Sequence, residues 1–339
     1  MPVLGWACVL AVLGGAAAAG ALIGPVPLPP GAILLEVLGR LPCVHVRSGL
    51  SAAQAAILWQ IRLPRVALGL LVGSMLSLAG SAYQGVFRNP LADPYLLGAA
   101  AGAGLGATLV ITFGIQGGIG PVGPVQAAAF AGALVAVAAT WLLGRGQYRI
   151  RSTASLILAG VAVTSLFTAL QTYFQQRADA SLRIVYSWIL GRLTTAGWHD
   201  VELMLPWAVV ATVALMLHRR ALDVLAVGDE EAASLGLPVD RIRMTVVVAA
   251  SLATAAAVSV SGLIGFVGII VPHTVRLLVG TSNRAVIPLS LVAGGAFLVV
   301  ADLFARTVIA PGEVPIGVIT ALVGAPFFLA LLARRVPRQ

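Results

Sequence analysis

The heptapeptide RNPLADP, at residues 88–94, concentrates polar and charged side chains between two stretches that carry almost no charge. Pro90 cannot continue a helix, and it disfavours helical backbone at Asn89. Asn89 can hydrogen-bond the freed backbone, while Asp93 and Pro94 are typical of the N-cap and first position of a new helix. The segment is therefore either a plain loop or a gate, because broken helices in a membrane occur where they are buried in protein or line a cavity.

A second polar stretch, ALDVLAVGDEEAASLGLPVDRIR at residues 221–243, contains three consecutive acidic residues from Asp229 to Glu231. Negative charge suits the first turn of a helix, and Gly236 followed by Pro238 is typical of a helix end. The pattern predicts a short helix outside the membrane. Because such a short helix is marginal alone in water, it must pack on the chain's own surface or dock into a cytoplasmic partner.

Three arginines, Arg62, Arg65 and Arg306, are expected at the outer ends of apolar helices. Long basic side chains in such places can extend to the membrane interface as anchors. They can also meet carboxylates of an external partner, and charge pairs of that kind orient docking. The sequence leaves both interpretations open.

Enzymatic chemistry is not expected. All 21 basic residues are Arg, and a P-loop needs a Lys, so the chain is not itself a P-loop ATPase. Cys8 lies in an apolar run and Cys43 in a loop, which indicates neither a disulfide nor a metal site. The sequence shows no nucleophile–base pair and no metal-ligand cluster, and His273 is interpreted as structural. Nearly all of the twelve acidic residues fall in loops, whereas ion-coupled carriers usually keep some at mid-membrane.

The elements that position these residues are apolar. Hydrophobic residues make up 59% of the chain and charged residues 10%, with a mean hydropathy of +1.00, whereas soluble domains carry about 25% charge. Lipid is therefore the expected solvent. Abundant Gly and Ala favour close helix packing, and the low aromatic content argues against a β-barrel. The net charge of +9 falls in gaps between apolar runs, so membrane topology explains it better than nucleic-acid binding.

Ten membrane-spanning helices of about 20 residues are predicted, in a single domain of residues 1–339. The first is interpreted as a retained helix rather than a signal peptide, because no positive charge precedes it and further spans follow. The fold class is therefore all-α and polytopic. The expected spans are residues 4–23, 63–83, 95–114, 122–143, 154–174, 203–218, 242–260, 263–279, 286–303 and 315–333.

The arginine distribution predicts the orientation. With the N-terminus inside, the inner connections hold 13 Arg and the outer side holds 8. Positive charge is enriched on the cytoplasmic side of membrane proteins, so both termini are expected in the cytoplasm.

Several long segments resemble the FecCD family, the permease subunits of bacterial importers for ferric siderophores, haem and vitamin B12. The resemblance extends over nearly the whole chain beyond residue 55. The segments that carry it are WQIRLPRVALGLLVGSMLSLAGSAYQGVFRNPLADPYLLG (59–98), STASLILAGVA (152–162), GDEEAASLGLP (228–238), GLIGFVGIIVPHTVRLLVG (262–280) and ADLFARTVIAPGEVPIGVITALVGAPFFLALL (301–332).

The resemblance implies a multi-pass protein of the bacterial plasma membrane that works as a homodimer, with two separate ATPase subunits below and an extracytoplasmic substrate-binding protein above. ATP and Mg would be bound by the ATPase, and no cofactor by this chain. By the same resemblance, Arg62, Arg65 and Arg306 match the binding-protein contacts, and segment 221–243 matches the coupling helices. The coupling residues would be Asp229, Glu230, Glu231, Ala232, Ser234, Leu235, Gly236 and Leu237.

The resemblance also assigns the gate and the path. Asn89, Pro90 and Leu91 match one element of a cytoplasmic gate, and Thr153 with Ala154 matches the other. The family often has a second hydroxyl after the Thr, so Ala154 would change the polarity of the gate. The helix at 154–174 would line the translocation path with small residues, namely Ala159, Gly160 and Ser165.

Two other functions fit an apolar helical protein. An ion-gradient-driven secondary transporter needs no ATPase, although the scarcity of acidic residues in the spans argues against it. A membrane scaffold would use the same partners and conduct nothing. The segment 24–58 is expected to form a partly helical outer cap.

Overall fold

The computed structural model of the chain describes residues 3–40, 46, 48–144, 153–177, 181–194, 197–310 and 312–335. Within these ranges the regular secondary structure is helical, apart from one isolated bridge between Ile119 and Val122, and loops and turns connect the helices. The helices in chain order are α1 (Val3–Leu22), α2 (Pro30–Leu38), α3 (Ala52–Ala56), the π-helix η1 (Ile57–Arg62), α4 (Leu63–Val86), α5 (Ala99–Thr112), α6 (Pro124–Leu143), α7 (Thr153–Gln175), α8 (Leu182–Ile189), α9 (His199–Leu225), α10 (Asp229–Ser234), α11 (Val239–Ser261), α12 (Val267–Val279), α13 (Asn283–Thr307) and α14 (Ile316–Arg335).

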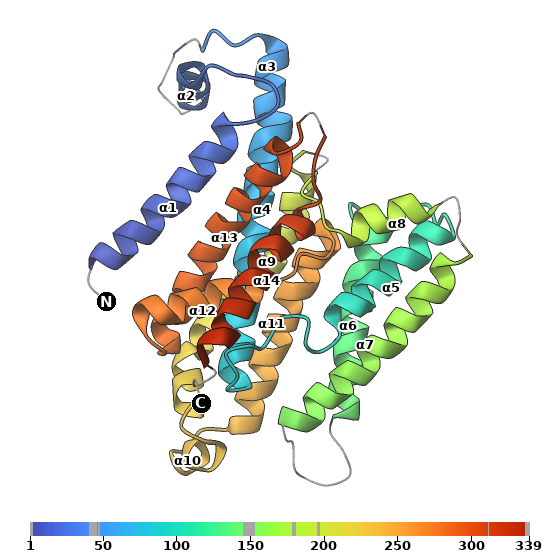
Figure 1. Cartoon of the computed structure of the whole chain (residues 1–339), viewed down its shortest axis with the longest axis vertical. Helices are drawn as coiled ribbons and strands as arrows, with labels where there is room; N and C mark the ends of the chain where they lie inside the picture. Colours follow the sequence, from blue (N-terminus) through green and yellow to red (C-terminus); the bar gives the residue numbers. More distant parts are fainter. Residues whose placement is uncertain are drawn as a thin grey trace.

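The long helices run between two ends of the molecule (Figure 1). One end carries α2 and α3, and we call it the α2 end; the opposite end carries α10, and we call it the α10 end. The first described residues of α1 and the last of α14 point toward the α10 end. The two described ends of the chain thus have the same orientation.

Helix α4 is the centre of the bundle and packs against α9, α11, α12 and α13. Its close contacts depend on glycine. A Cβ at Gly73 would overlap the carbonyl of Gly294 in α13, and a Cβ at Gly80 would overlap the carbonyl of Gly268 in α12. These positions confirm the expectation that small residues let the helix backbones approach each other.

Helices α5, α6 and α7 form a second group beside the α4 bundle, with α8 across its α2 end (Figure 1). Gly102 of α5 and Gly132 of α6 face each other so closely that a Cβ on either would overlap the other's carbonyl. Helix α11 contacts α5 and α6 as well as α4, so it joins the two groups.

A helix lies at each of the ten predicted spans. Six are long and apolar enough to cross a membrane: Ala52–Val86, Pro124–Leu143, Ala154–Gln175, His199–Leu225, Val239–Ser261 and Asn283–Thr307. Four more are apolar but shorter: Val9–Leu22, Ala99–Thr112, Val267–Val279 and Ile316–Leu331. The chain is therefore an integral membrane protein, with its apolar helices where the hydropathy pattern predicts them.

The expected cap at 24–58 is built from α2, α3 and η1, which lie together at the α2 end (Figure 1). Glu36 holds it together, because its carboxylate accepts hydrogen bonds from Ser48 Oγ (2.5 Å) and from Trp59 Nε1 (3.2 Å). Ser51 begins α3 with a capping box formed with Gln54. Helix α8 was not predicted from the sequence.

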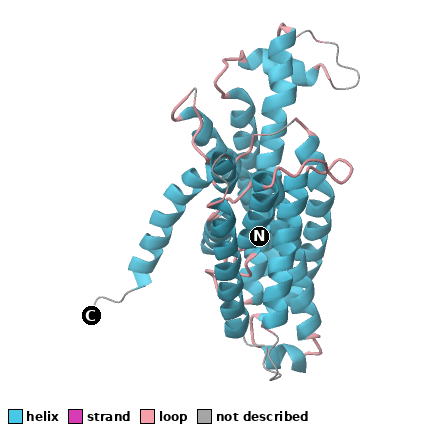
Figure 2. Ribbon diagram, turned by 90° about the vertical axis from the view of Figure 1, so that its right-hand side faces the viewer, coloured by secondary structure: helices cyan, strands magenta, loops and turns pink. Residues whose placement is uncertain are grey.

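Two apolar helices leave much of their apolar surface exposed. Only 17% of the apolar window of α7 is buried, and Leu158, Val161 and Leu166 are exposed along it. Figure 2 shows α14 leaning away from the bundle, and Leu322 and Leu329 of this helix are exposed. Apolar faces on α7 and α14 thus remain uncovered within one chain.

Candidate functional site

The RNPLADP segment is an ordered turn at the α10 end of α4. Arg88 follows the last turn of α4 with a positive φ of 49°. The backbone N–H of Asn89 donates to Gln84 O (3.2 Å), and its side-chain Oδ1 accepts from Leu91 N (3.0 Å). Asn89 therefore closes the end of α4 and hydrogen-bonds the backbone after Pro90, in agreement with the predicted hydrogen-bonding role.

The expected helix start at Asp93–Pro94 is wrong. Asp93 Oδ1 accepts from Tyr95 N (2.7 Å), which closes a local turn instead of capping a helix. Helix α5 begins only at Ala99, after Gly98 with a φ of 85°. The intervening residues pack into the bundle: a Cβ at Gly268 would overlap the ring of Pro94, and Tyr95 Oη donates to Ile264 O (3.0 Å). Tertiary contacts therefore replace the first turn of the predicted helix.

The predicted helix in segment 221–243 is confirmed as α10, which projects from the bundle (Figure 1). Gly236 ends it with a φ of 82°, and Leu237 N donates to Ala232 O (3.0 Å), the pattern expected of a glycine helix end. Ala232 is fully buried against the bundle. The predicted coupling residues Glu230, Glu231, Ser234 and Leu235 are exposed, and Leu235 is 73% exposed.

Asp229 joins α10 to both neighbouring elements. Arg243 Nη2, from α11, donates to both carboxylate oxygens of Asp229 (2.9 and 2.8 Å). Arg88 Nη2, from the RNPLADP turn, lies 3.3 Å from Asp229 Oδ1. The structure therefore brings the predicted gate turn and the predicted coupling helix into direct contact.

A further polar network ties α4, α9, α12 and α13 together at the same end. Asp223 of α9 accepts from Ser282 Oγ (2.8 Å) and from Asn283 N (2.5 Å) at the start of α13. Arg276 of α12 donates to Asn283 Oδ1 (3.2 Å) and to Gln84 Oε1 of α4 (3.3 Å). Four helices are thereby cross-linked beside the turn.

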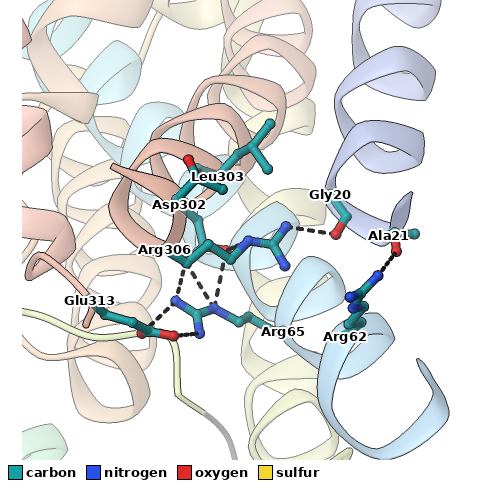
Figure 3. A network of polar contacts seen from close by, with 9 residues as sticks. Gly20, Ala21, Arg62, Arg65, Asp302, Leu303, Arg306 and Glu313 are labelled. Atoms are coloured by element: carbon teal, nitrogen blue, oxygen red, sulfur yellow. Dashed lines mark hydrogen bonds and ion pairs between the residues drawn. The ribbon is translucent and has the colours of Figure 1, made fainter. Parts of the chain in front are cut away.

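At the α2 end, Arg65 lies in a buried ion network (Figure 3). Its guanidinium donates to both oxygens of Asp302, at 2.8 to 3.1 Å, and to both oxygens of Glu313, at 2.8 and 3.0 Å. Arg306 Nε lies 3.5 Å from Asp302 Oδ2. Two cations and two anions thus balance in a region where Asp302 and Arg306 are almost fully buried.

Arg62 and Arg306 also bind the end of α1. Arg306 Nη2 donates to Gly20 O (2.6 Å), and Arg62 Nη1 donates to Ala21 O and Leu22 O (both 3.1 Å). Arg62 Nη2 donates to Val26 O as well. The last carbonyls of a helix have no partner within the helix and carry the negative end of its dipole, so positive donors stabilise this end.

The three arginines predicted to meet an external partner are therefore buried and paired within the chain. Each has under a tenth of its surface exposed. Neither the anchor nor the docking interpretation anticipates this arrangement. The partners Glu313 and Asp302 are not predicted from the sequence, although Asp302 precedes Arg306 by one helical turn in an otherwise apolar helix, and this spacing is a signal for the pair.

The predicted path residues do not share one environment on α7. Gly160 is buried, and a Cβ there would overlap the carbonyl of Leu96. Ala159 is half-buried, whereas Ser165 and Ala154 are exposed. Thr153 begins α7. Gly160 is therefore a packing residue in this structure, and the exposed face of the helix lies elsewhere.

Comparison with known proteins shows which proteins are similar to this chain. The model of the FecCD transport family matches residues 9–334. The chain is 43% identical over 310 residues to the cobalamin import system permease protein BtuC of Halobacterium salinarum, covering 91% of this chain and 82% of the relative. It is 37% identical over 285 residues to the hemin transport system permease protein HmuU of Yersinia pestis, covering 81% of this chain and 82% of the relative.

A solved structure of a metal-chelate type ABC transporter in an inward-facing conformation has a similar fold. The TM-score is 0.82 and the sequence identity 28%, with 96% of this chain and 97% of the other covered. Because the family model spans nearly the whole chain, the resemblance found in its motifs is confirmed: the protein is a member of the FecCD transport family.

Proposed function

We propose that this chain is the permease subunit of an ATP-driven importer. It would form the translocation path and gates for an iron complex, haem or a corrinoid, with a separate ATPase supplying the energy. The names of the relatives, which import cobalamin, hemin and Fe(3+)-citrate, support this cargo class. In this proposal all ten apolar helices cross the bacterial plasma membrane, the α10 end and both termini face the cytoplasm, and the α2 end faces outward.

The observation that carries the proposal is that the short helix α10 projects from the bundle and is fixed to it. A six-residue helix is too short to be stable alone, yet it is fixed to the bundle through Ala232 and the Asp229 ion pairs. Leu235, directly after the helix, and Val227, two residues before it, are both largely exposed, as are the acidic side chains of Glu230 and Glu231. A rigid projection with an exposed apolar tip suits docking into a groove of an ATPase.

We expect Leu235→Asp to weaken ATPase binding without unfolding the permease. Burying a carboxylate at an apolar contact is costly, whereas in the free chain this side chain lies in solvent. Co-purification of the ATPase should fall about tenfold or more, since an interface hot spot is typically worth 2 kcal/mol or above. Ala233→Ser, at an exposed neighbouring position, is the matched control. Unchanged ATPase recovery with Leu235→Asp would contradict the docking assignment.

We also propose that the chain works as a homodimer with the path between the two copies. The uncovered apolar faces of α7 and α14 support this, because contiguous exposed apolar surface marks interaction sites. Ala159 and Ser165 would then face the path, while Gly160 would hold α7 against Leu96. A large cargo would pass small and apolar side chains that make only weak contacts.

The RNPLADP turn and the start of α7 are proposed as the two elements of the cytoplasmic gate. In a chain with Cys8→Ser and Cys43→Ser, we expect Leu91→Cys to form a cross-link between the two copies that blocks import. Reduction of the disulfide should restore import, because the cross-link blocks the path only mechanically. Full import with the cross-link formed would contradict the gate assignment. Leu205→Cys, exposed on α9, is the control position.

On the outward side, the proposed partner is a substrate-binding protein. Arg62, Arg65 and Arg306 stay candidates for this contact only if they exchange their internal partners for carboxylates of that protein. Their present hydrogen bonds give them a structural role whether or not they do so.

The deciding experiment is gentle extraction of the chain from its native membrane, followed by mass spectrometry of the proteins that co-purify. An ATPase and an extracytoplasmic binding protein are expected. The binding protein can then be titrated with cobalamin, haemin and ferric citrate to identify the cargo. A chain that is recovered alone, and that transports when an ion gradient replaces ATP, would contradict the importer proposal.

A further inference from the structure

We propose that Asp229 connects the coupling helix to the gate through Arg88, so that the RNPLADP turn follows α10 when α10 is displaced. The inference rests on the proposed function, in which α10 receives the movement of the ATPase. It adds a specific residue pair that transmits this movement within the permease.

The geometry comes from three elements that meet at one carboxylate. Asp229 is the first residue of α10, Arg88 lies in the turn after α4, and Arg243 lies in the first turns of α11. Arg243 Nη2 reaches both oxygens of Asp229 (2.9 and 2.8 Å), while Arg88 Nη2 reaches Oδ1 (3.3 Å). The pair Arg88–Asp229 therefore crosses directly from the gate turn to the coupling helix.

The two cations have different surroundings. The side chain of Arg243 is almost fully buried, whereas those of Arg88 and Asp229 are each 41% exposed. A buried arginine needs its partner, because an unpaired buried charge is costly. Arg243 therefore holds Asp229 in place against α11, and the fixed carboxylate is presented to Arg88 without a further ordering cost for Asp229.

The backbone of Arg88 supports the link. Its φ of 49° lies in the left-handed region, which a non-glycine residue rarely occupies unless its surroundings hold it there. On one side the turn is tied to α4 by the bond from Asn89 N to Gln84 O. On the other side the Arg88 side chain is tied to α10. A displacement of α10 thus acts directly on a residue whose backbone is already in a sparsely populated conformation.

An exposed ion pair usually contributes little to stability. Coupling between two conformational states needs only a small difference in free energy, since allosteric couplings typically correspond to factors of about 5 to 150. A pair that shifts the equilibrium between two positions of the gate turn by such a factor is sufficient to decide whether ATP hydrolysis produces import. The loss of the pair should therefore affect coupling more than folding.

The test uses the complete complex in liposomes, with ATP inside and the binding protein with cyanocobalamin outside. We expect Arg88→Gln to lower cyanocobalamin uptake per ATP hydrolysed by about fivefold or more, while ATP hydrolysis itself changes by less than about twofold. Arg88→Lys should restore part of the coupling. The double variant Arg88→Gln/Asp229→Asn should be no worse than Asp229→Asn alone, because the two changes remove the same contact.

The matched control is Arg284→Gln. Arg284 is an exposed arginine at the same end that forms a pair of similar length with Asp223 (3.7 Å), and its loss should leave coupling unchanged. Uptake per ATP that is equal in Arg88→Gln and the original chain would overturn the proposal. Equal loss of uptake and ATP hydrolysis would also overturn it, since this would indicate a docking or folding role.

A second readout requires no cargo. A nitroxide at Leu91→Cys, in a chain with Cys8→Ser and Cys43→Ser, reports the distance between the two gate turns of the dimer. Trapping with ATP and vanadate should shift this distance in the labelled chain that keeps Arg88, and not in the labelled chain with Arg88→Gln. The same shift in both, or in neither, contradicts the inference. A shift that occurs with Arg88 present and is lost in Arg88→Gln, in a complex that imports no cyanocobalamin, supports the link and excludes only a corrinoid among the proposed cargoes.

Discussion

Replacing Arg65 by Met should lower the free energy of unfolding by about 3–5 kcal/mol, the cost of breaking a buried ion pair by removing one partner. In the intact network, Arg65 and Arg306 balance Asp302 and Glu313. Without Arg65, one cation faces two carboxylates, and Asp302 remains almost fully buried. The measurement is thermal unfolding of the purified protein in detergent, together with the yield of folded protein.

A second variant keeps this result interpretable if Arg65→Met fails to fold. Arg65→Met/Glu313→Gln leaves Arg306 and Asp302 as one positive and one negative charge. Because the charges then balance again, the double variant should recover part of the lost stability. Arg192→Met is the control, because Arg192 is an exposed arginine beside the same cavity of about 290 Å³ that Arg65 and Glu313 line. Unchanged stability in Arg65→Met would show that the network contributes nothing to the fold.

Gly80→Ala should be strongly destabilising, although it adds only one methyl group. The added Cβ would overlap the carbonyl carbon and oxygen of Gly268, and a backbone atom cannot move aside as a flexible side chain can. Overpacking of a core costs about 1–3 kcal/mol when side chains yield, so we expect a loss above this range. Helices α4 and α12 would have to separate, and the measurement is again thermal unfolding.

The control for this prediction is Gly15→Ala in α1, where a Cβ would meet nothing within 4 Å. There Ala should be neutral or slightly stabilising, because it favours a helix more than Gly does. If Gly80→Ala and Gly15→Ala unfold at the same temperature, the close approach of α4 to α12 is not a feature of the folded protein.

The predictions for Arg65 and Arg88 concern opposite ends of one bundle, and these ends differ in physical character. At the α2 end the ion network is buried and its members bind several partners each. At the α10 end, Arg88 and Asp229 are partly in solvent. A rigid α2 end and a more easily rearranged α10 end fit the proposal that movement enters through α10.

The sequence alone determined where the long apolar helices lie. A run of apolar residues long enough for a membrane has few alternatives to helix, since every backbone group must be hydrogen-bonded internally. For this reason the expected ranges 122–143 and 154–174 match α6 and α7 closely. Local chemistry also determined the end of α10, where Gly236 adopts the left-handed backbone that the pattern predicts.

The same reasoning failed at Asp93–Pro94. These residue types are typical of a helix start, but no helix begins there. Pro94 packs against Gly268, and Tyr95 binds Ile264, so contacts with a distant helix decide the backbone. A residue pattern of seven positions contains no information about a neighbour more than 160 residues away.

Tertiary structure alone decided the partners of the charged residues. The sequence placed Arg62, Arg65 and Arg306 at the outer ends of helices and left their partners open, whereas the fold pairs them with Asp302, Glu313 and the carbonyls that end α1. It likewise brings Arg88 to Asp229 across 141 positions of sequence. Hydropathy fixes the depth of a side chain in the membrane, but only helix packing fixes which opposite charge lies beside it, because the interaction falls off with distance in space and not along the chain.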